Sequence, residues 1–187
     1  MKTLLTKNRI QKLKIYIELA NSLEGNFAEV GVYKGGSAEI IANSKSEHKN
    51  LYLFDTFEGM PKTNKKYDNF HKKNDFSDTS YENICLEFSK HDSVFVYKGI
   101  FPDEHGEKIQ NEIFSLVHLD VDIYKSYIDC LNFFYPKMTN GGIIILDDYL
   151  SPNCEGAKLA IDEFFANKPE KPIWQIKPQA CIIKQPT

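Results

Sequence analysis

The strongest constraint on the fold is a regular alternation of strand-like and helix-like segments. Short apolar runs typical of strands occur near residues 27–32, 51–55, 94–97, 114–122 and 143–146. Between them, apolar residues recur at spacings of three and four, which is the period of an amphipathic helix. This alternation predicts an α/β fold in which helices cover both faces of a mostly parallel sheet.

The expected helices can be placed from their apolar stripes. One stripe runs through Ile10 and Ala20, and a second helix should cover residues 37–45. A Thr79–Glu82 capping box should open a third helix. Two more are expected from the stripes Tyr124, Ile128, Leu131 and Tyr135, and Ala157, Ala160, Ile161 and Phe164. Near the end, segments 173–176 and 180–183 have no helix between them, so we expect an antiparallel hairpin.

Length and composition narrow the class of protein. A chain of 187 residues fits one domain, which we divide into a helical N-terminal arm (1–24) and a main domain (25–187). At this size roughly 70% of the unfolded surface is buried, so neither disulfide nor zinc is required. The four cysteines form no CxxC pair, and we expect reduced thiols in a cytoplasmic protein.

The charge and the hydropathy pattern exclude other classes. A formal net charge of -3 argues against a dedicated nucleic-acid-binding protein. No apolar run approaches the ~18 residues of a membrane span. The basic N-terminus carries too short an apolar stretch for a signal peptide. We therefore expect no nucleic-acid or membrane partner.

Polar residues follow the first two predicted strands at the edge where open α/β sheets bind ligands. Gly31 and Gly35-Gly36 let the backbone pass close to a ligand, and the helix that begins near Ser37 offers free amides. Asp55 ends the second strand, where an acidic residue binds a ribose in dinucleotide-binding folds. Together these features favour a nucleoside ligand over a simple tight turn.

Four aspartates follow the next two strands. Asp120 and Asp122 point to the same face of an extended segment, and Asp147 and Asp148 end a strand that should be its neighbour. Carboxylates that converge repel one another unless protonation or a cation relieves the repulsion. Oxygen ligands suit Mg²⁺, Mn²⁺ or Ca²⁺ rather than zinc. The alternative is that both pairs are solvated caps.

The segment Thr56–Asp78 has no apolar periodicity, so it is expected to be a lid or a disordered stretch. Five lysines between positions 62 and 73 fit two interpretations that both stay open, an anionic acceptor such as a nucleotide-linked sugar, or a passive loop whose lysines only maintain solubility. We expect His71 at the surface, His118 as a hydrogen-bonded structural residue and Trp174 in the core.

Six motifs, in chain order, resemble the macrocin O-methyltransferase (TylF-type) family across residues 25–165. They are Glu29–Ser37 (EVGVYKGGS), Leu53–Pro61 (LFDTFEGMP), Phe76–Ser80 (FSDTS), Gly99–Asp103 (GIFPD), His118–Ser126 (HLDVDIYKS) and Gly141–Tyr149 (GGIIILDDY). The resemblance implies a Rossmann-like class I methyltransferase, with a seven-stranded sheet whose last strand is antiparallel. It also implies transfer of a methyl group from S-adenosylmethionine (SAM) to a sugar hydroxyl with Mg²⁺, and a homo-oligomer.

The resemblance also implies roles for individual residues. The methionine part of SAM would be surrounded by Glu29, Gly31, Tyr33 and Ser37. The ribose would be held by Asp55 beside Thr56 and Phe57, and the adenine approached by Asp78 and Gly99. The metal ligands would be Asp120, Asp147 and Asp148, with Asp120 also bordering SAM. Asp122 and Asp120 would be the catalytic residues, with Asp122 the proposed base and Asp120 the alternative.

Two other classes of function stay open. The Asp-Val-Asp sequence also fits the metal motif of a phosphatase or a nucleotide-sugar transferase, although an aspartate-nucleophile phosphatase normally opens its domain with that pair. The other class is a protein that binds SAM without catalysis. Methyl transfer to an acceptor, rather than SAM binding, distinguishes an enzyme from it.

Overall fold

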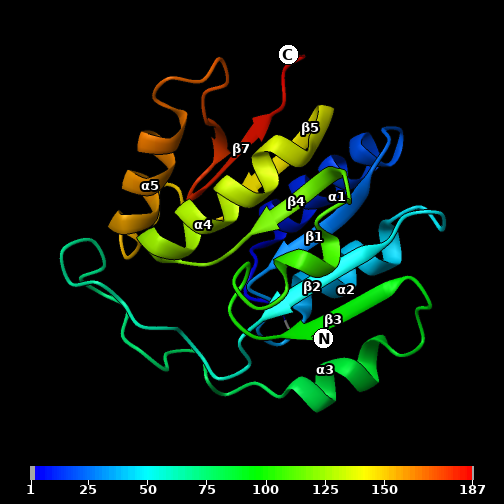
Figure 1. Ribbon diagram of the computed structural model, residues 1–187, viewed down its shortest axis with the longest axis horizontal. Helices are drawn as coiled ribbons and strands as arrows, with labels where there is room; N and C mark the ends of the chain where they lie inside the picture. Colours follow the sequence, from blue (N-terminus) through cyan, green and yellow to red (C-terminus); the bar gives the residue numbers. More distant parts are fainter. Residues whose placement is uncertain (1–2, 187) are drawn as a thin grey trace.

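The computed structural model describes residues 3–186 and has three layers, with a sheet between two sets of helices (Figure 1). The seven strands have the order β3-β2-β1-β4-β5-β7-β6. They are β1 (Asn26–Val30), β2 (Leu51–Asp55), β3 (Val94–Lys98), β4 (Phe114–Leu119), β5 (Met138–Leu146), β6 (Ile173–Ile176) and β7 (Gln179–Ile183). Strands β1 to β5 are parallel, whereas β7 is antiparallel to both β5 and β6. The predicted fold class and closing hairpin are confirmed.

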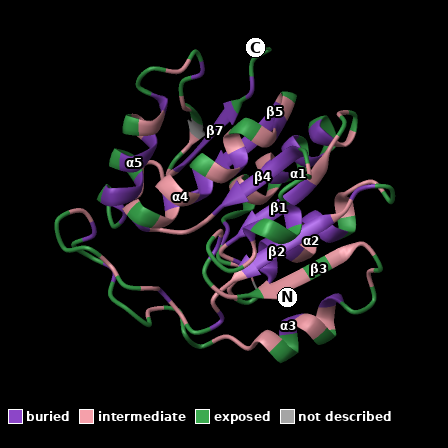
Figure 2. Cartoon of the chain, viewed as in Figure 1, coloured by how far each residue is buried: buried purple, intermediate pink, exposed green. Residues whose placement is uncertain are grey.

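Helices cover both faces of this sheet. One face packs against α1 (Lys7–Asn21), α2 (Gly36–Ser44) and α3 (Tyr81–Phe88). The other packs against α4 (Tyr124–Phe134) and α5 (Glu155–Phe165), and two short 3-10 helices cover Gly106–Ile109 and Tyr135–Lys137. Neighbours on β4 divide between the two layers, with Leu116 in one apolar cluster and Val117 in the other. The central strands are therefore buried on both sides (Figure 2).

Two details of the helices differ from the sequence predictions. The N-cap of α3 is Ser80, which accepts a hydrogen bond from the Asn83 amide at 3.2 Å. Thr79 instead donates to the carbonyl of Tyr33 and so ties the start of α3 to the loop after β1. The sheet-facing side of α4 is also shifted, since the buried residues are Tyr127, Cys130, Leu131 and Phe134.

The prediction for Trp174 is wrong, because β6 forms the end of the sheet and leaves this side chain 56% exposed. The four cysteines are free thiols. Within the described residues, no helix combines the length and apolar character needed to span a membrane.

Candidate active site

A cavity of about 300 Å³ opens at the carboxyl ends of β1, β2, β4 and β5. Strands β1 and β4 are neighbours there, although the chain passes from β1 to β2 on the other side. Such a switch point is where open α/β sheets bind their ligands. The predicted site residues that line the cavity are Gly31, Tyr33, Ser37, Asp55, Thr56, Gly99, Asp120, Asp122, Asp147 and Asp148.

Three predicted site residues lie outside the cavity wall. Glu29 is fully buried beneath it, with Oε1 2.7 Å from Nδ1 of His118. Phe57 packs against Tyr81 in the core. Asp78 is exposed and accepts hydrogen bonds from the Tyr33 hydroxyl, at 2.7 Å, and from Lys34.

The loop after β1 forms one wall of the cavity. Gly31 has φ +92°, and a Cβ there would collide with the backbone of Asp120, so this position requires glycine. Gly35, at φ +75°, is the N-cap of α2. Because the first amides of a helix have no partner within it, Gly36 and Ser37 bring free donors to the cavity wall.

Asp55 joins the loops that follow β1 and β2. Its Oδ2 accepts a hydrogen bond from the Tyr33 amide and its Oδ1 from the Phe57 amide, both at 2.7 Å. Both donor residues have positive φ values, 50° and 52°, so Asp55 stabilises two unusual backbone turns. Each carboxylate oxygen keeps lone-pair capacity for a further donor.

Asp120, Asp122 and Asp148 form a compact carboxylate group, with one oxygen of each lying within 4.8 Å of the others. Asp122 has φ +57°, and its amide donates to Oδ2 of Asp148 at 3.0 Å. The same oxygen accepts the Tyr127 hydroxyl at 2.9 Å. The turn after β4 is thereby fixed to the end of β5.

Burial disfavours negative charge on all three carboxylates. It raises the pKa of Asp120 well above its usual range, with further contributions from the charges of Asp148 and Asp122. Burial and the charge of Asp148 raise the pKa of Asp122 to about 8. Burial also raises the pKa of Asp148. A divalent cation would relieve these costs, and hard oxygen donors at this spacing fit Mg²⁺.

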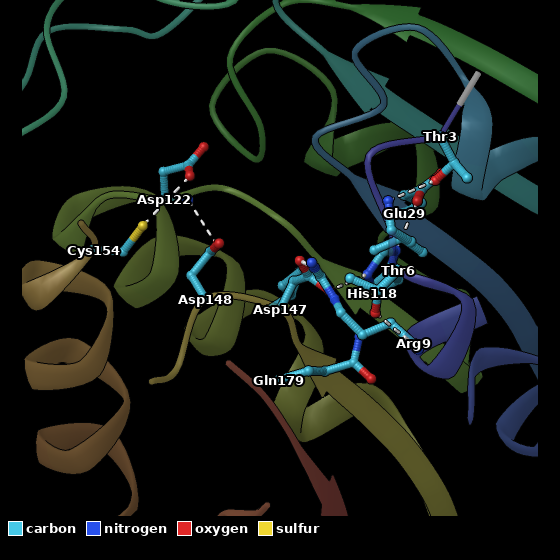
Figure 3. Close-up of polar contacts among 12 residues, drawn as sticks. Thr3, Thr6, Arg9, Glu29, His118, Asp122, Asp147, Asp148, Cys154 and Gln179 are labelled. Carbon is cyan, nitrogen blue, oxygen red and sulfur yellow. Dashed lines mark hydrogen bonds and ion pairs between the residues drawn. The ribbon is translucent and has the colours of Figure 1, made fainter. Parts of the chain in front are cut away.

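Asp147 lies beside Arg9, His118 and Gln179, whereas its neighbour Asp148 lies beside Asp122 (Figure 3). Asp147 forms an ion pair with Arg9 and accepts a hydrogen bond from Gln179 Nε2 at 2.7 Å. Its Oδ1 is 3.5 Å from Nε2 of His118, and Asp120, Asp147 and His118 form a second close group. Asp120 therefore belongs to both groups, whereas Asp147 has a cationic partner of its own.

The buried His118 joins Glu29 to Asp147. Burial lowers the pKa of His118, but the hydrogen bond that its ring donates to Glu29 and the charge of that carboxylate outweigh this effect, so the pKa is raised. The prediction that His118 is hydrogen-bonded is confirmed, and its side chain is fully buried.

The prediction that His71 lies at the surface is wrong. The irregular segment between β2 and α3 crosses toward the N-terminal ends of α4 and α5 (Figure 1) and leaves His71 only 8% exposed. Its Nε2 is 3.5 Å from Asp122 Oδ1 and 3.5 Å from Cys154 Sγ. Sequence reasoning missed this contact because the polar segment shows no apolar pattern.

Asp68 anchors the same segment. Its Oδ1 accepts a hydrogen bond from the Tyr124 amide at 2.9 Å, and the N-cap of α4, Ile123, makes no side-chain cap of its own. The ring of Tyr67 stacks on that of Tyr124, with centroids 4.2 Å apart. A Cβ at Gly156 would collide with Asp68, so α5 leaves room for this contact.

Asp68→Ala should therefore free the segment 56–80 and weaken α4. Loss of a side-chain acceptor for the first amides of a helix costs about 1–2 kcal/mol of unfolding free energy, which urea denaturation would measure. Hydrogen exchange of residues 56–80 should accelerate, while the exposed Asp92→Ala serves as control. Unchanged exchange in Asp68→Ala would contradict the anchoring role.

Comparison with known proteins identifies the family of the chain. The family model described as macrocin-O-methyltransferase (TylF) matches residues 1–184. The demethyldecarbamoylnovobiocin O-methyltransferase of Streptomyces niveus is 24% identical over 179 residues, covering 88% of this chain and 68% of the relative. The 8-demethyl-8-(2,3-dimethoxy-alpha-L-rhamnosyl)-tetracenomycin-C 4'-O-methyltransferase of Streptomyces olivaceus is 26% identical over 171 residues, covering 83% of this chain and 65% of the relative.

Solved structures agree in fold. The O-methyltransferase NovP superposes with a TM-score of 0.83 at 24% identity, covering 98% of this chain and 82% of NovP. An O-methyltransferase from Bacillus cereus, solved in complex with SAH, superposes with a TM-score of 0.66 at 15% identity, covering 96% of this chain and 82% of that one. With the family model matched along nearly the whole sequence, the chain belongs to the macrocin O-methyltransferase (TylF) family.

Proposed function

We propose that this protein transfers the methyl group of SAM to a hydroxyl group of a sugar, with Mg²⁺ bound beside the acceptor. The observation that carries the proposal is one cavity that joins Asp55, at the end of β2, to the carboxylates at the ends of β4 and β5. The Streptomyces olivaceus relative is named for 4'-O-methylation of a rhamnosyl compound, which supports a sugar as acceptor. The Bacillus cereus neighbour in complex with SAH supports SAM as donor.

In this proposal the nucleoside part of SAM lies along the ends of β1 and β2. Asp55 accepts hydrogen bonds from the two ribose hydroxyls, using the oxygen lone pairs that the Tyr33 and Phe57 amides leave free. The methionine part extends over Gly31 toward Asp120, where the backbone of β1 meets that of β4. This orientation directs the methyl group toward the carboxylates.

Asp122 is the proposed base. Methyl transfer is an in-line displacement in which the acceptor oxygen bonds to the methyl carbon while the carbon–sulfur bond breaks. The acceptor hydroxyl must lose its proton, and the Asp122 carboxylate takes it. The fixed turn after β4 holds this carboxylate beside Asp148.

The cation would be held by Asp120 and Asp148, which lie in one close group. The family resemblance adds Asp147, whose carboxylate lies in the second group and is paired with Arg9. When bound, Mg²⁺ supplies positive charge that orients the acceptor and lowers the pKa of its hydroxyl. The chain's own contribution is the spacing of Asp120 and Asp148 and the burial of Asp147 and Asp148. His71 and Asp68 hold the segment 56–78 over this end of the site, which supports its proposed role as a lid.

Asp55→Ala should weaken SAM binding about 10- to 100-fold, because hydrogen bonds to a charged group contribute roughly 1.5–3 kcal/mol. Calorimetric titration with SAM measures the effect. Asp55→Asn keeps one acceptor oxygen and should lose less. If both variants bound SAM like the wild type, the ribose site would have to lie elsewhere.

The proposed reaction is tested by incubating the protein with SAM carrying a labelled methyl group, Mg²⁺ and a panel of acceptors. The panel should contain free glycosides and nucleotide-linked sugars, because the lysine-rich lid also supports an anionic acceptor. Label recovered in a sugar by mass spectrometry supports the proposal. SAM binding without transfer to any acceptor would instead favour a non-catalytic protein.

A further inference from the structure

Arg9 is exceptional in composition. Of the 23 lysine and arginine residues in the chain, Arg9 is the only arginine. Lysine serves wherever a flexible positive charge is enough, whereas arginine presents a planar fork of donors that binds a carboxylate with two parallel hydrogen bonds. Arg9 is therefore the one residue of the chain able to meet a requirement for this fork.

The position of Arg9 fits such a requirement. It lies in the first turn of α1, its side chain is 12% exposed, and it is one of the residues that line the cavity. Its terminal nitrogen pairs with Asp147. Its Nε is buried and has no hydrogen-bond partner among the described residues (Figure 3). A buried donor without a partner is costly, so this nitrogen is ready for an acceptor that the protein itself does not provide.

The charges of the cavity indicate what that acceptor is. The wall carries five carboxylates, Asp55, Asp120, Asp122, Asp147 and Asp148. The basic residues in the wall are Arg9 and Lys34, and Lys34 is 44% exposed and paired with Asp78. SAM has a positive sulfonium and a positive ammonium group, which suit this wall, but its one carboxylate would be repelled from most of it. Arg9 offers the buried positive charge that this group needs.

We infer that Arg9 binds the carboxylate group of the methionine portion of SAM. The inference rests on the proposed function, since it presumes SAM as ligand. The guanidinium keeps Asp147 on one terminal nitrogen and presents Nε to the ligand. Because Asp147 also belongs to the group formed with Asp120, this arrangement links the donor's carboxylate to the end of β5 where the acceptor is proposed to bind.

The test compares two ligands that differ in this carboxylate alone, SAM and decarboxylated SAM. Calorimetry should show that the wild type prefers SAM about 10- to 100-fold, the scale of hydrogen bonds to a charged group. Arg9→Gln should remove that preference and bind both ligands about as the wild type binds decarboxylated SAM. Lys7→Gln is the matched control, because it removes one positive charge from an exposed site on the same helix.

Arg9→Lys separates charge from geometry, and it also guards against loss of folding in Arg9→Gln. It should recover only part of the preference, since a single ammonium nitrogen cannot replace the two guanidinium nitrogens that contact Asp147 and the ligand. Equal loss of affinity for both ligands in the variants would overturn the inference. It would show that Arg9 acts only through its ion pair with Asp147. A full preference for SAM in Arg9→Gln would also overturn it. A wild type that bound neither ligand would instead overturn the proposed function, and the role of Arg9 with it.

Discussion

Removal of divalent cations with EDTA should abolish methyl transfer, and added Mg²⁺ should restore it. Asp148→Asn should likewise abolish methyl transfer, and added Mg²⁺ should not restore it. A bound cation stabilises developing charge by several kcal/mol, so turnover should fall at least about 10²-fold in each case. SAM affinity should stay within a few-fold, because Asp148 lies at the end of β5 and away from the proposed ribose site at Asp55. Turnover is measured with labelled SAM and the binding constants by calorimetry.

The control for Asp148→Asn is Asp92→Asn, which changes an exposed carboxylate before β3. It should leave turnover and metal response unchanged. Full activity of the EDTA-treated protein would contradict the proposed use of a metal. Loss of SAM binding in Asp148→Asn would show that the donor and metal sites are less separate than proposed.

The sequence predicted the fold because its constraints are local. The parallel strands β1, β2, β4 and β5 are largely apolar, and each is followed by polar residues that line the cavity. The carboxyl ends of parallel strands share one edge of the sheet. Asp55, Asp120 and Asp148 were therefore placed together without knowledge of any side-chain contact.

Contacts made by residues far apart in the chain could not be predicted in this way. Arg9 meets Asp147 across the sheet edge, and neither residue's neighbours in the sequence indicate the other. His71 and Asp68 lie in a polar segment whose docking depends on the exposed N-terminus of α4 and on space at Gly156. The sheet-facing side of α4 likewise depends on the turn at residues 120–123, which sets the rotation of the helix.

The cluster of Asp120, Asp122 and Asp148 lowers the stability of the folded protein when its carboxylates are ionised and no metal is bound. The pKa of Asp122 is about 8 in the folded state and near the usual 3.8 in the unfolded chain. Between these values the folded state holds a proton that the unfolded state has lost, so the free energy of unfolding falls as pH rises. The metal-free protein should thus be less stable at pH 8 than at pH 5, and Mg²⁺ should stabilise it more at the higher pH.

Asp122→Asn should change turnover and stability in opposite directions. Loss of a general base lowers turnover about 10²- to 10⁴-fold. The neutral amide cannot be forced to ionise, so the metal-free variant should be more stable than the wild type at pH 8 by roughly 2–4 kcal/mol, with a smaller difference at pH 5. Urea unfolding in EDTA at both pH values, together with single-turnover assays in Mg²⁺, measures the two effects.

The same variant distinguishes the two roles open to Asp122. If Asp122 is a base that does not ligate the cation, Asp122→Asn should lose turnover while its affinities for Mg²⁺ and SAM stay close to those of the wild type. If Asp122 is a metal ligand, Asp122→Asn should lower the Mg²⁺ affinity as well as the turnover. The roles proposed for Asp120 and Asp122 would then have to be reversed. An oxygen of Asp120 and an oxygen of Asp122 both lie within 4.8 Å of an oxygen of Asp148, so either residue could ligate a cation together with Asp148. The Mg²⁺ affinity of Asp122→Asn decides between them.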